Sequence, residues 1–378
     1  MTASFSISSS FDAGNIRVTS TDCAAAPWRA ELEIAADHQS EFYQWFHFRV
    51  SGAAGQAVQL VLTNCAGAAY PGGWPGYKAR VSEDRVHWRM AETDYADGRL
   101  TIRVTPQTNA LWVAYFAPYS MERHHDLIAW AAGQPGVAHK ELGLTLDGQP
   151  LDLISMGEGA KQVWLYARQH PGETMAEWWM EGALRRLCDP EDSVARLLRA
   201  RARIHCVPNM NPDGSRRGHL RTNAVGVNLN REWHDPSLER SPEVFHVRAE
   251  MDSTGVDFAI DVHGDEAIPH VFIAGFEGVP SLKEDRLALY HRYREVLAAR
   301  TPDFQTKVGY PVSSPGRANL SMSTAQLAER YGAVSMTLEM PFKDHDDLPD
   351  ADYGWSPARS MQLGRDCLAV LAEMIDDV

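Results

Sequence analysis

The chain has 378 residues, of which 44% are hydrophobic and 23% are charged, and its formal net charge is −14. This length favours two domains, and the composition is that of an ordinary globular protein with enough apolar material for a packed core. The negative charge argues against a general binder of nucleic acid or of anionic membranes, so we expect neither partner. The sequence predicts no oligomeric state.

The sequence shows no clear signal for export or for a membrane location. Charged residues interrupt the longest apolar runs well before they reach a length of about 18 residues, which a membrane-spanning helix requires. No membrane segment is therefore expected. The first residues, MTASFSISSSF, have neither the basic region nor the apolar region of a signal peptide. The cysteines are scattered without a CxxC pair, which indicates reduced, buried thiols rather than a disulfide framework or a thiolate zinc site. Together these features favour the cytoplasm. The cysteines are Cys23, Cys65, Cys188, Cys206 and Cys367.

Residues 1–118 have the pattern of a β domain. Polar and apolar residues alternate in 41–50, 58–62 and 99–104, and turn signals rich in glycine, asparagine and proline separate these runs. Short strands at this spacing are typical of an antiparallel sandwich. We therefore expect an N-terminal β-sandwich domain over 1–118, and its sequence contains no cofactor motif that would define its role.

Residues 119–378 alternate between strand and helix patterns. Such alternation predicts an α/β fold with a mixed, largely parallel sheet flanked by helices. The last helix opens with Ser356-Pro357, a favourable pair for an N-cap and a first helical residue. The predicted strands are 161–167, 203–207, 256–262 and 333–338, and the predicted helices are 174–188, 281–300, 322–332 and 357–376.

Two segments that follow predicted strands carry a candidate metal site. His170 and Glu173 stand in RQHPGE after strand 161–167, and His263 directly follows strand 256–262. In a parallel sheet both segments emerge at the carboxyl edge, where open α/β sheets place their sites. Two histidines and one glutamate leave the fourth zinc position to water, which is a catalytic rather than a structural arrangement. We therefore predict that these three residues bind Zn²⁺. Manganese or cobalt could occupy the same ligands, and the coordination geometry would have to exclude them.

Other histidines are weaker candidates. His38 and Glu41 repeat the H-x-x-E spacing, but they precede a predicted strand of the β domain and have no partner histidine at a comparable strand end, so we interpret them as surface residues. The pair His124-His125 is a stronger rival, although neither has a carboxylate at ligand spacing. His170 is favoured because of its strand–loop–helix context.

A carboxylate that could act as a base ends another predicted strand. Glu339 follows strand 333–338 and is flanked by apolar residues. At the carboxyl edge of a sheet it can take a proton from metal-activated water. On position alone, a buried glutamate in an ion pair is an equally good interpretation.

An arginine-rich segment lies between the second predicted strand and the next helix. Arg216, Arg217 and Arg221 precede the run GVNLNR. Guanidinium groups suit the capture of a carboxylate, and one could stabilise an oxyanion. We interpret Arg216 and Arg217 as solvated surface.

At these residues the chain resembles the zinc metallocarboxypeptidases, and specifically their cytosolic carboxypeptidase branch. The first half resembles that branch's N-terminal β-sandwich in FDAGN (11–15), QWFHF (44–48) and YFAPY (115–119). The resemblance therefore covers nearly the whole chain. In the second half it rests on HPGE (170–173), NPDG (211–214), Arg221 with NLNR (228–231), His263 and Glu339.

The resemblance implies a set of roles at the metal. His170, Glu173 and His263 would bind zinc. Glu339 would be the general base and later the proton donor to the leaving amine. The β-sandwich would be a permanent domain, so the enzyme would be made without an inhibitory propeptide.

The resemblance also implies how a substrate would be held. Arg221 would polarise the scissile carbonyl and stabilise the oxyanion. Asn230 and Arg231 would grip the terminal carboxylate of the peptide, which makes such an enzyme cut from the C-terminus. The expected partners are therefore the C-termini of peptides or proteins.

Three positions depart from the family pattern or stay open. Asn228 stands where relatives commonly carry an aspartate that orients a metal-binding histidine, and the lost charge should make the imidazole a poorer ligand. Tyr310 and Tyr331 are both candidates for the tyrosine that closes over substrate. Many members of the branch prefer C-terminal glutamate, and Arg317 could read such a side chain or could be a surface arginine.

The leading hypothesis is a metallocarboxypeptidase that hydrolyses the C-terminal residue of peptide or isopeptide-like substrates and somewhat favours acidic residues. One alternative is a zinc amidohydrolase of small N-acyl amino acids, which a test of substrate length would distinguish. The other is a non-catalytic peptide-binding module, against which the full set of expected catalytic residues counts.

Overall fold

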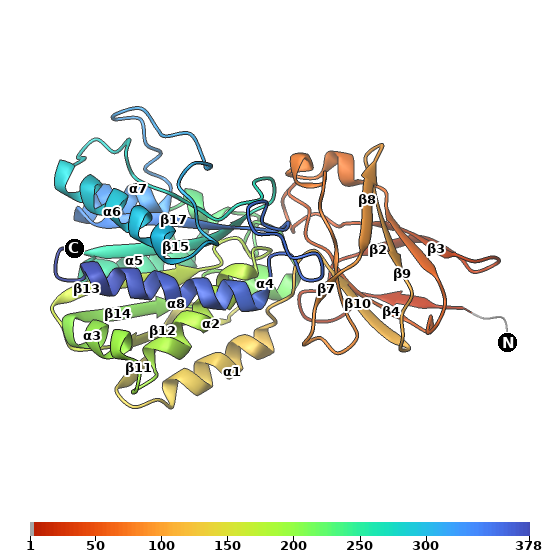
Figure 1. The fold of residues 1–378 in the computed structure, drawn as a ribbon, viewed down its shortest axis with the longest axis horizontal. Helices are drawn as coiled ribbons and strands as arrows, with labels where there is room; N and C mark the ends of the chain where they lie inside the picture. The colour runs from red at the N-terminus through yellow and green to blue at the C-terminus, as the bar shows by residue number, and fades with distance from the viewer. Residues whose placement is uncertain (1–3) are drawn as a thin grey trace.

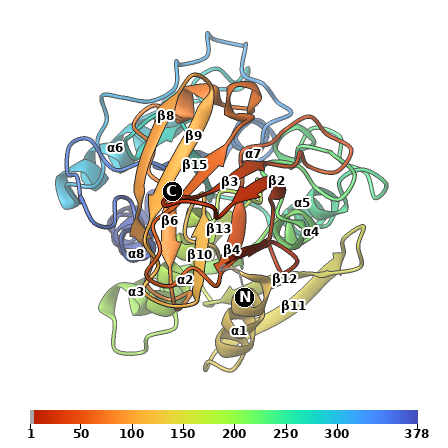
Figure 2. The same ribbon diagram turned by 90° about the vertical axis from the view of Figure 1, so that its right-hand side faces the viewer.

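In the computed structural model, residues 4–378 are described, so the first three residues of the expected N-terminal domain lie outside the described part. The chain forms a β-rich part at one end and an α/β part at the other (Figure 1). Seen from the N-terminal end, the β-rich part lies in front of the α/β part (Figure 2). Among the described residues, no helix is long and apolar enough to cross a membrane.

The N-terminal part consists of two five-stranded sheets, ordered β1-β4-β10-β6-β7 and β2-β3-β5-β9-β8. Alternate residues of β3 and β9 are buried, so each strand turns one face inward as in the expected sandwich. The pairing is antiparallel except between β3 and β5, which run parallel. The strands are β1 (Ser6–Ser8), β2 (Arg17–Asp22), β3 (Trp28–Glu33), β4 (His47–Ser51), β5 (Val58–Leu62), β6 (Arg80–Ser82), β7 (Arg89–Met90), β8 (Glu92–Ala96), β9 (Arg99–Val104) and β10 (Ala110–Ala114).

One predicted strand, 41–50, is wrong over its first half. The strand begins only at His47, and residues 41–46 form a loop whose side chains make specific contacts. The Gln44 amide donates to the carbonyl of Tyr70 and the Trp45 indole to the carbonyl of Ala13. The alternation in the sequence therefore reflects burial of this loop and not strand pairing.

The second part is built on a seven-stranded sheet in the order β11-β12-β14-β13-β15-β17-β16. Its four central strands run parallel, and the flanking strands are antiparallel, which confirms the expected mixed sheet. The strands are β11 (Val137–Leu144), β12 (Pro150–Met156), β13 (Lys161–Ala167), β14 (Ala202–Val207), β15 (Phe258–Asp265), β16 (Phe272–Ala274) and β17 (Val334–Pro341).

Helices cover both faces of this sheet (Figure 1). In β13, Val163, Leu165 and Ala167 pack with α2 and α8, whereas Trp164 and Tyr166 pack with α5 and α7. A strand buried on both faces explains the continuous apolar run from which it was predicted. The helices are α1 (Met121–Ala132), α2 (Met175–Leu187), α3 (Ser193–Arg201), α4 (Pro212–Arg217), α5 (Pro242–Thr254), α6 (Glu284–Arg300), α7 (Ser323–Tyr331) and α8 (Pro357–Met374).

The predicted helices correspond to α2, α6, α7 and α8. The Ser356 hydroxyl accepts from the amide of Arg359 and Pro357 is the first helical residue, so the predicted start of α8 is confirmed. The sequence pattern did not identify α1, α3, α4 and α5. In α3 only Ala195 and Leu198 are buried, so the apolar face is short.

Helix α5 contains a buried acid, Glu243, which is 1% exposed. Its Oε2 atom accepts one long hydrogen bond, 3.4 Å from Nδ2 of Asn223, and within residues 4–378 its Oε1 atom has no partner. Burial raises the pKa of Glu243 from its ordinary value of 4.5 to about 8.

Because of the Glu243 carboxyl, we expect the free energy of unfolding to fall as the pH rises from about 4.5 to about 8. In that window the unfolded chain has released the proton while the folded chain still holds it, so each pH unit lowers the free energy of unfolding by about 1 kcal/mol. Below 4.5 both states are protonated and the full stability is present. The free energy of unfolding of Glu243→Gln, measured with urea, should therefore rise relative to that of the unmodified protein between pH 5 and 8. Glu239→Gln, at an exposed position, is the control, and parallel stability curves for Glu243→Gln and the unmodified protein would contradict the prediction.

Candidate metal centre and substrate cavity

The segment after β13 turns sharply at Arg168. This residue has φ of 62°, an uncommon conformation for a residue other than glycine, and its side chain is buried. Its guanidinium donates to the carbonyls of Pro171 (3.0 Å) and Tyr119 (2.8 Å) and to the Glu177 carboxylate (2.6 Å). These bonds fix the loop that presents His170 and Glu173, a role that the sequence analysis did not assign to Arg168.

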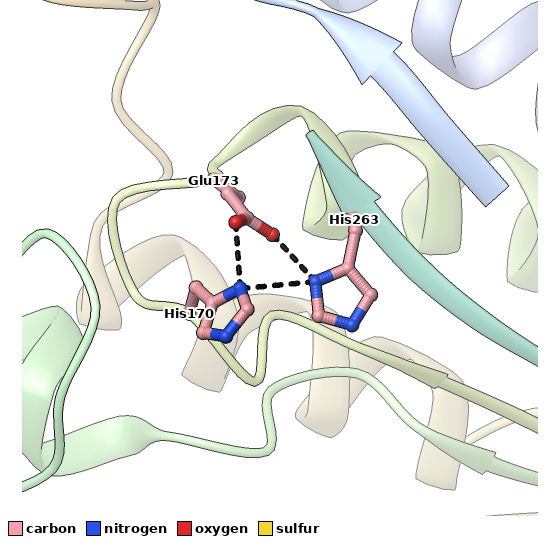
Figure 3. Close-up of side chains that lie close together, drawn as sticks. All are labelled: His170, Glu173 and His263. Atoms are coloured by element: carbon pink, nitrogen blue, oxygen red, sulfur yellow. Dashed lines mark hydrogen bonds and ion pairs between the residues drawn. The ribbon is translucent and has the colours of Figure 1, made fainter. Parts of the chain in front are cut away.

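The three predicted ligands meet at one point (Figure 3). Nδ1 of His170 lies 2.7 Å from Oε1 of Glu173, and Nδ1 of His263 lies 2.7 Å from Oε2 of the same carboxylate. The two Nδ1 atoms are 3.1 Å apart. All three residues are buried, so three polar groups converge where water has little access.

The outer nitrogen of each imidazole has its own partner. Nε2 of His170 lies 3.1 Å from the amide oxygen of Asn228, and Nε2 of His263 lies 2.9 Å from a carboxylate oxygen of Asp261. An acceptor at Nε2 favours the tautomer whose Nδ1 lone pair faces the other ligands. The contact of Asn228 was expected from the sequence, whereas no role was expected for Asp261.

The charges of the ligands suit a cation. Burial and the nearby Arg221 lower the pKa of His170 to about 4, so its imidazole is neutral. Burial works against ionisation of Glu173, but His170 and His263 hold its pKa well below the usual range. Burial alone would lower the pKa of His263, yet Asp261 and Glu173 raise it well above 6.5. A metal ion would replace the proton on His263.

These residues fit zinc by the chemistry of the donor set: two imidazole nitrogens and one carboxylate, each oriented by an outer contact. A second group, His270, His345 and Asp347, also has its ligand atoms within 4.8 Å of one another. There Nδ1 of His345 already accepts from the backbone amide of Asp347, and the Asp347 side chain is 61% exposed. The first group is therefore the better metal site.

Glu339 lies beside the predicted ligands, because it pairs with His263 in the register of β15 and β17. It is 6% exposed, and among the described residues its Oε2 atom has no hydrogen-bond partner. The Tyr310 hydroxyl donates to Oε1 over 3.3 Å. Burial and the carboxylates of Glu173 and Asp265 raise the pKa of Glu339 well above 4.5, although His263 opposes this.

A cavity of about 720 Å³ opens over these groups. It is lined by the three predicted ligands and Glu339, and also by Arg221, Asn230 and Arg231, so the structure brings all seven predicted site residues together. Of the two tyrosines considered, Tyr310 lines the cavity, and its hydroxyl donates to Asp265 (2.6 Å). Tyr331 instead donates to Asp252, outside the cavity.

Of the two interpretations left open for Arg317, the structure favours the surface arginine. Arg317 is exposed and is not among the residues that line the cavity. Arg294 of α6 and Lys307 line it instead, together with Glu277. Arg294 could not be singled out from the sequence, because one arginine on a helix rich in arginine has no distinguishing context. Its Nε atom is buried and, within residues 4–378, has no hydrogen-bond partner.

Two family models match the chain. Residues 7–116 match the cytosolic carboxypeptidase N-terminal domain, and residues 125–268 match the zinc carboxypeptidase model. The second match contains the three predicted metal ligands, Arg221, Asn230 and Arg231. It ends before Glu339, so the case for that residue rests on its place in the cavity.

Individual proteins agree with these matches. A metallo-carboxypeptidase of Burkholderia cenocepacia superposes with a TM-score of 0.96 at 43% identity, over 99% of this chain and 100% of that one. An uncharacterised protein of Zymomonas mobilis is 65% identical over 98% of this chain and 97% of its own length. Cytosolic carboxypeptidase 4 of Mus musculus is 28% identical over 71% of this chain, which corresponds to 28% of the mouse protein.

We expect one tightly held zinc per chain. His263→Ala should remove it, because loss of one of three ligands leaves an incomplete site for a zinc ion. His345→Ala, in the second histidine group, should retain it. Metal content per chain, measured by mass spectrometry after dialysis against a weak chelator, checks both variants. Equal zinc content in His263→Ala and the unmodified protein would count against the site.

Proposed function

The chain belongs to the zinc carboxypeptidase family and carries the N-terminal domain of its cytosolic branch, and we propose that it removes single residues from the C-termini of peptide or isopeptide-like substrates. The observation that carries this proposal is the cavity shared by the histidine–glutamate cluster, the buried carboxylate of Glu339 and three side chains that bear a guanidinium or an amide.

We assign the metal to His170, Glu173 and His263. The convergence of two Nδ1 atoms on one buried carboxylate supports this assignment. Zinc bound there would act as a Lewis acid, polarising a carbonyl and making water more acidic. Because Asn228 offers His170 a neutral oxygen while Asp261 offers His263 a charged one, His170 is the weaker of the two imidazole donors.

Glu339 is the proposed carrier of protons. Its carboxylate would take a proton from the water whose oxygen attacks the scissile carbonyl carbon. It would then return that proton to the amide nitrogen as the carbon–nitrogen bond breaks and the amine leaves. The Oε2 atom, which has no hydrogen-bond partner within residues 4–378, and the raised pKa support both halves of this cycle, since the group must bind and release a proton.

Arg221 is the proposed partner of the oxyanion that develops on the scissile carbonyl. Its guanidinium lies between the rings of Phe42 and Tyr70, with the guanidinium carbon 5.6 and 5.5 Å from the ring centroids. Within residues 4–378 no carboxylate forms an ion pair with it, so its donors are available to a substrate.

Asn230 and Arg231 are proposed to bind the terminal carboxylate of the substrate. The Asn230 side-chain oxygen accepts from the amide of Ser323 (2.9 Å), and an Arg231 guanidinium nitrogen donates to the backbone carbonyl of Asn230 (2.6 Å). These bonds hold the two side chains at the cavity with donors left over. A planar guanidinium can bind a carboxylate with two parallel hydrogen bonds.

A preference for acidic C-terminal residues follows from Arg294 and Lys307. Both line the cavity, and within residues 4–378 the buried Nε atom of Arg294 has no hydrogen-bond partner. Glu277, Asp265 and Glu266 line the cavity as well, so the preference is assigned to ion pairs with Arg294 and Lys307 and not to the net charge of the cavity. We propose Arg294 rather than Arg317 as the residue that reads the side chain.

We further propose a domain boundary at residues 118 and 119, and a cytoplasmic location. Both sheets of the β-rich part end before this point, since β10 ends at Ala114 and α1 begins at Met121. The described cysteines are all free, and the matching N-terminal model and the mouse relative are both named cytosolic, which supports the location.

Glu339→Gln should abolish release of C-terminal residues while zinc stays bound. The amide has the volume of the carboxylate but cannot carry a proton, and such a loss is worth about 10²- to 10⁴-fold in kcat. The measurement uses peptides of two to ten residues that differ only in the last residue, with products followed by mass spectrometry.

The peptide lengths in this experiment separate the alternatives. Release that persists with the longest peptides supports an exopeptidase, whereas hydrolysis confined to N-acyl amino acids would indicate an amidohydrolase. A zinc-loaded protein inert towards every peptide and every N-acyl amino acid would leave only a binding role.

Arg294→Ala should lower kcat/KM for peptides ending in glutamate by ~10-fold or more and leave peptides ending in leucine within about 2-fold, because only the former loses an ion pair. Arg317→Ala, at the exposed arginine, should change neither. Equal losses on both peptides in Arg294→Ala would show that the residue does not read the side chain.

A further inference from the structure

One buried carboxylate of the N-terminal sandwich accepts hydrogen bonds from the catalytic part. Asp37 lies in the loop between β3 and β4 and is 3% exposed. Its Oδ1 atom accepts from the amide of Leu220 (2.7 Å), and its Oδ2 atom accepts from the amides of Arg221 and Thr222 and from the Thr222 hydroxyl (2.9 Å each). Three consecutive backbone amides therefore donate to the side chain of one residue that lies 183 to 185 positions earlier in the sequence.

The guanidinium of Arg221 also depends on the sandwich. Phe42 and Tyr70, between which it lies, belong to the same part of the chain as Asp37. Asp37 thus holds the backbone of Arg221, and two aromatic rings direct its side chain. A charge-assisted hydrogen bond to a carboxylate is about twice as strong as a neutral one, so the anchor is a firm one.

Neighbouring contacts hold the same segment. The amide of His38 donates to Nε2 of His219 (3.0 Å), whose Nδ1 lies 3.0 Å from the carbonyl of Thr222. Asn15 donates from its side chain to the carbonyl of Gly218 (2.9 Å). The side chain of His38, which we interpreted as surface, is exposed, and only its backbone takes part.

We infer that Asp37 is a positioning residue for the oxyanion-binding Arg221, so that the N-terminal sandwich completes the active site. This inference rests on the proposed function for its catalytic consequence. Oxyanion stabilisation requires donors that are already in place when the charge develops. Because Asp37 fixes three successive amides at Arg221, its loss would let the guanidinium move. The carbonyl of Leu220 also accepts from the amide of Gly172 in the ligand loop (2.9 Å), but three hydrogen bonds from Arg168 hold that loop separately, so the zinc ligands should stay in place.

The test compares Asp37→Asn with Asp12→Asn. The amide at position 37 keeps the volume and one acceptor oxygen, so the fold should survive. Asp12 is the matched control, because it too is a sandwich carboxylate that accepts an amide of the catalytic part, Met121 (2.9 Å), at another place. Hydrogen exchange of peptides covering residues 219–224 should accelerate in Asp37→Asn alone, with zinc content unchanged. This window leaves out Arg216, whose carbonyl accepts from the amide of Ala13 beside Asp12. Unchanged exchange in Asp37→Asn would overturn the inference, whatever the activity.

The catalytic arm is a double-mutant cycle with Arg221→Ala. In the unmodified background, Asp37→Asn should lower kcat by ~10- to 100-fold, the range that a small misplacement of a catalytic group produces, with KM within about 3-fold. In the Arg221→Ala background its effect should fall below about 2-fold, because residues that act as a unit are not additive. An equal loss in both backgrounds would mean a merely structural role and would overturn the inference. If the unmodified protein releases no C-terminal residue, the proposed function fails, while the exchange measurement still decides the place of Asp37.

Discussion

The site depends on the parallel register of β13, β15 and β17. Ala167 is paired with Val262, and His263 with Glu339, so the carboxyl ends of the three strands lie at the same edge with fixed spacing. Each of these strands is buried over most of its length and held by the hydrogen-bond ladder, so the spacing of His263 and Glu339 does not depend on loop conformation. The loop after β13 adds the other two predicted ligands, His170 and Glu173, and Arg168 fixes that loop by three hydrogen bonds.

Charge balance is the second constraint. The carboxylates of Glu173, Asp265, Glu266 and Glu339 surround one small buried region, and burial together with Glu173 and Asp265 raises the pKa of Glu266 well above 4.5. Buried charges are tolerated only when they are paired or bind a cation. Arg221 lowers the pKa of Glu266, and a divalent ion at the histidines would offset the rest. The positive groups of the cavity are therefore as necessary to its stability as to its chemistry.

The sequence predicted what is locally encoded. The bounds of β5, β9 and β13 are as expected, because alternation or a continuous apolar run reports burial directly. Strand β11 was missed because it is an edge strand with mostly exposed residues. The metal ligands could be found because each lies at or just beyond the carboxyl end of a recognisable strand. Asp261 stands two residues before His263 without a signal of its own, and Asp37 had none, because its contacts lie more than 180 residues away. Arg317 was left open between two interpretations, whereas the cavity is lined by an arginine from a helix.

The bond between Asp37 and the 220–222 segment has a consequence for how such a chain can change over time. Three amides on one half are complementary to a carboxylate on the other, so neither half can be exchanged with that of a distant relative unless the matching group travels with it. Recombination at the proposed boundary would leave either a buried anion without donors or a set of amides without an acceptor, and each is expensive in a dry interface. The pairing therefore constrains the two halves to change together, and a chimaera that joins them from different lineages should be judged first by whether it conserves this pairing.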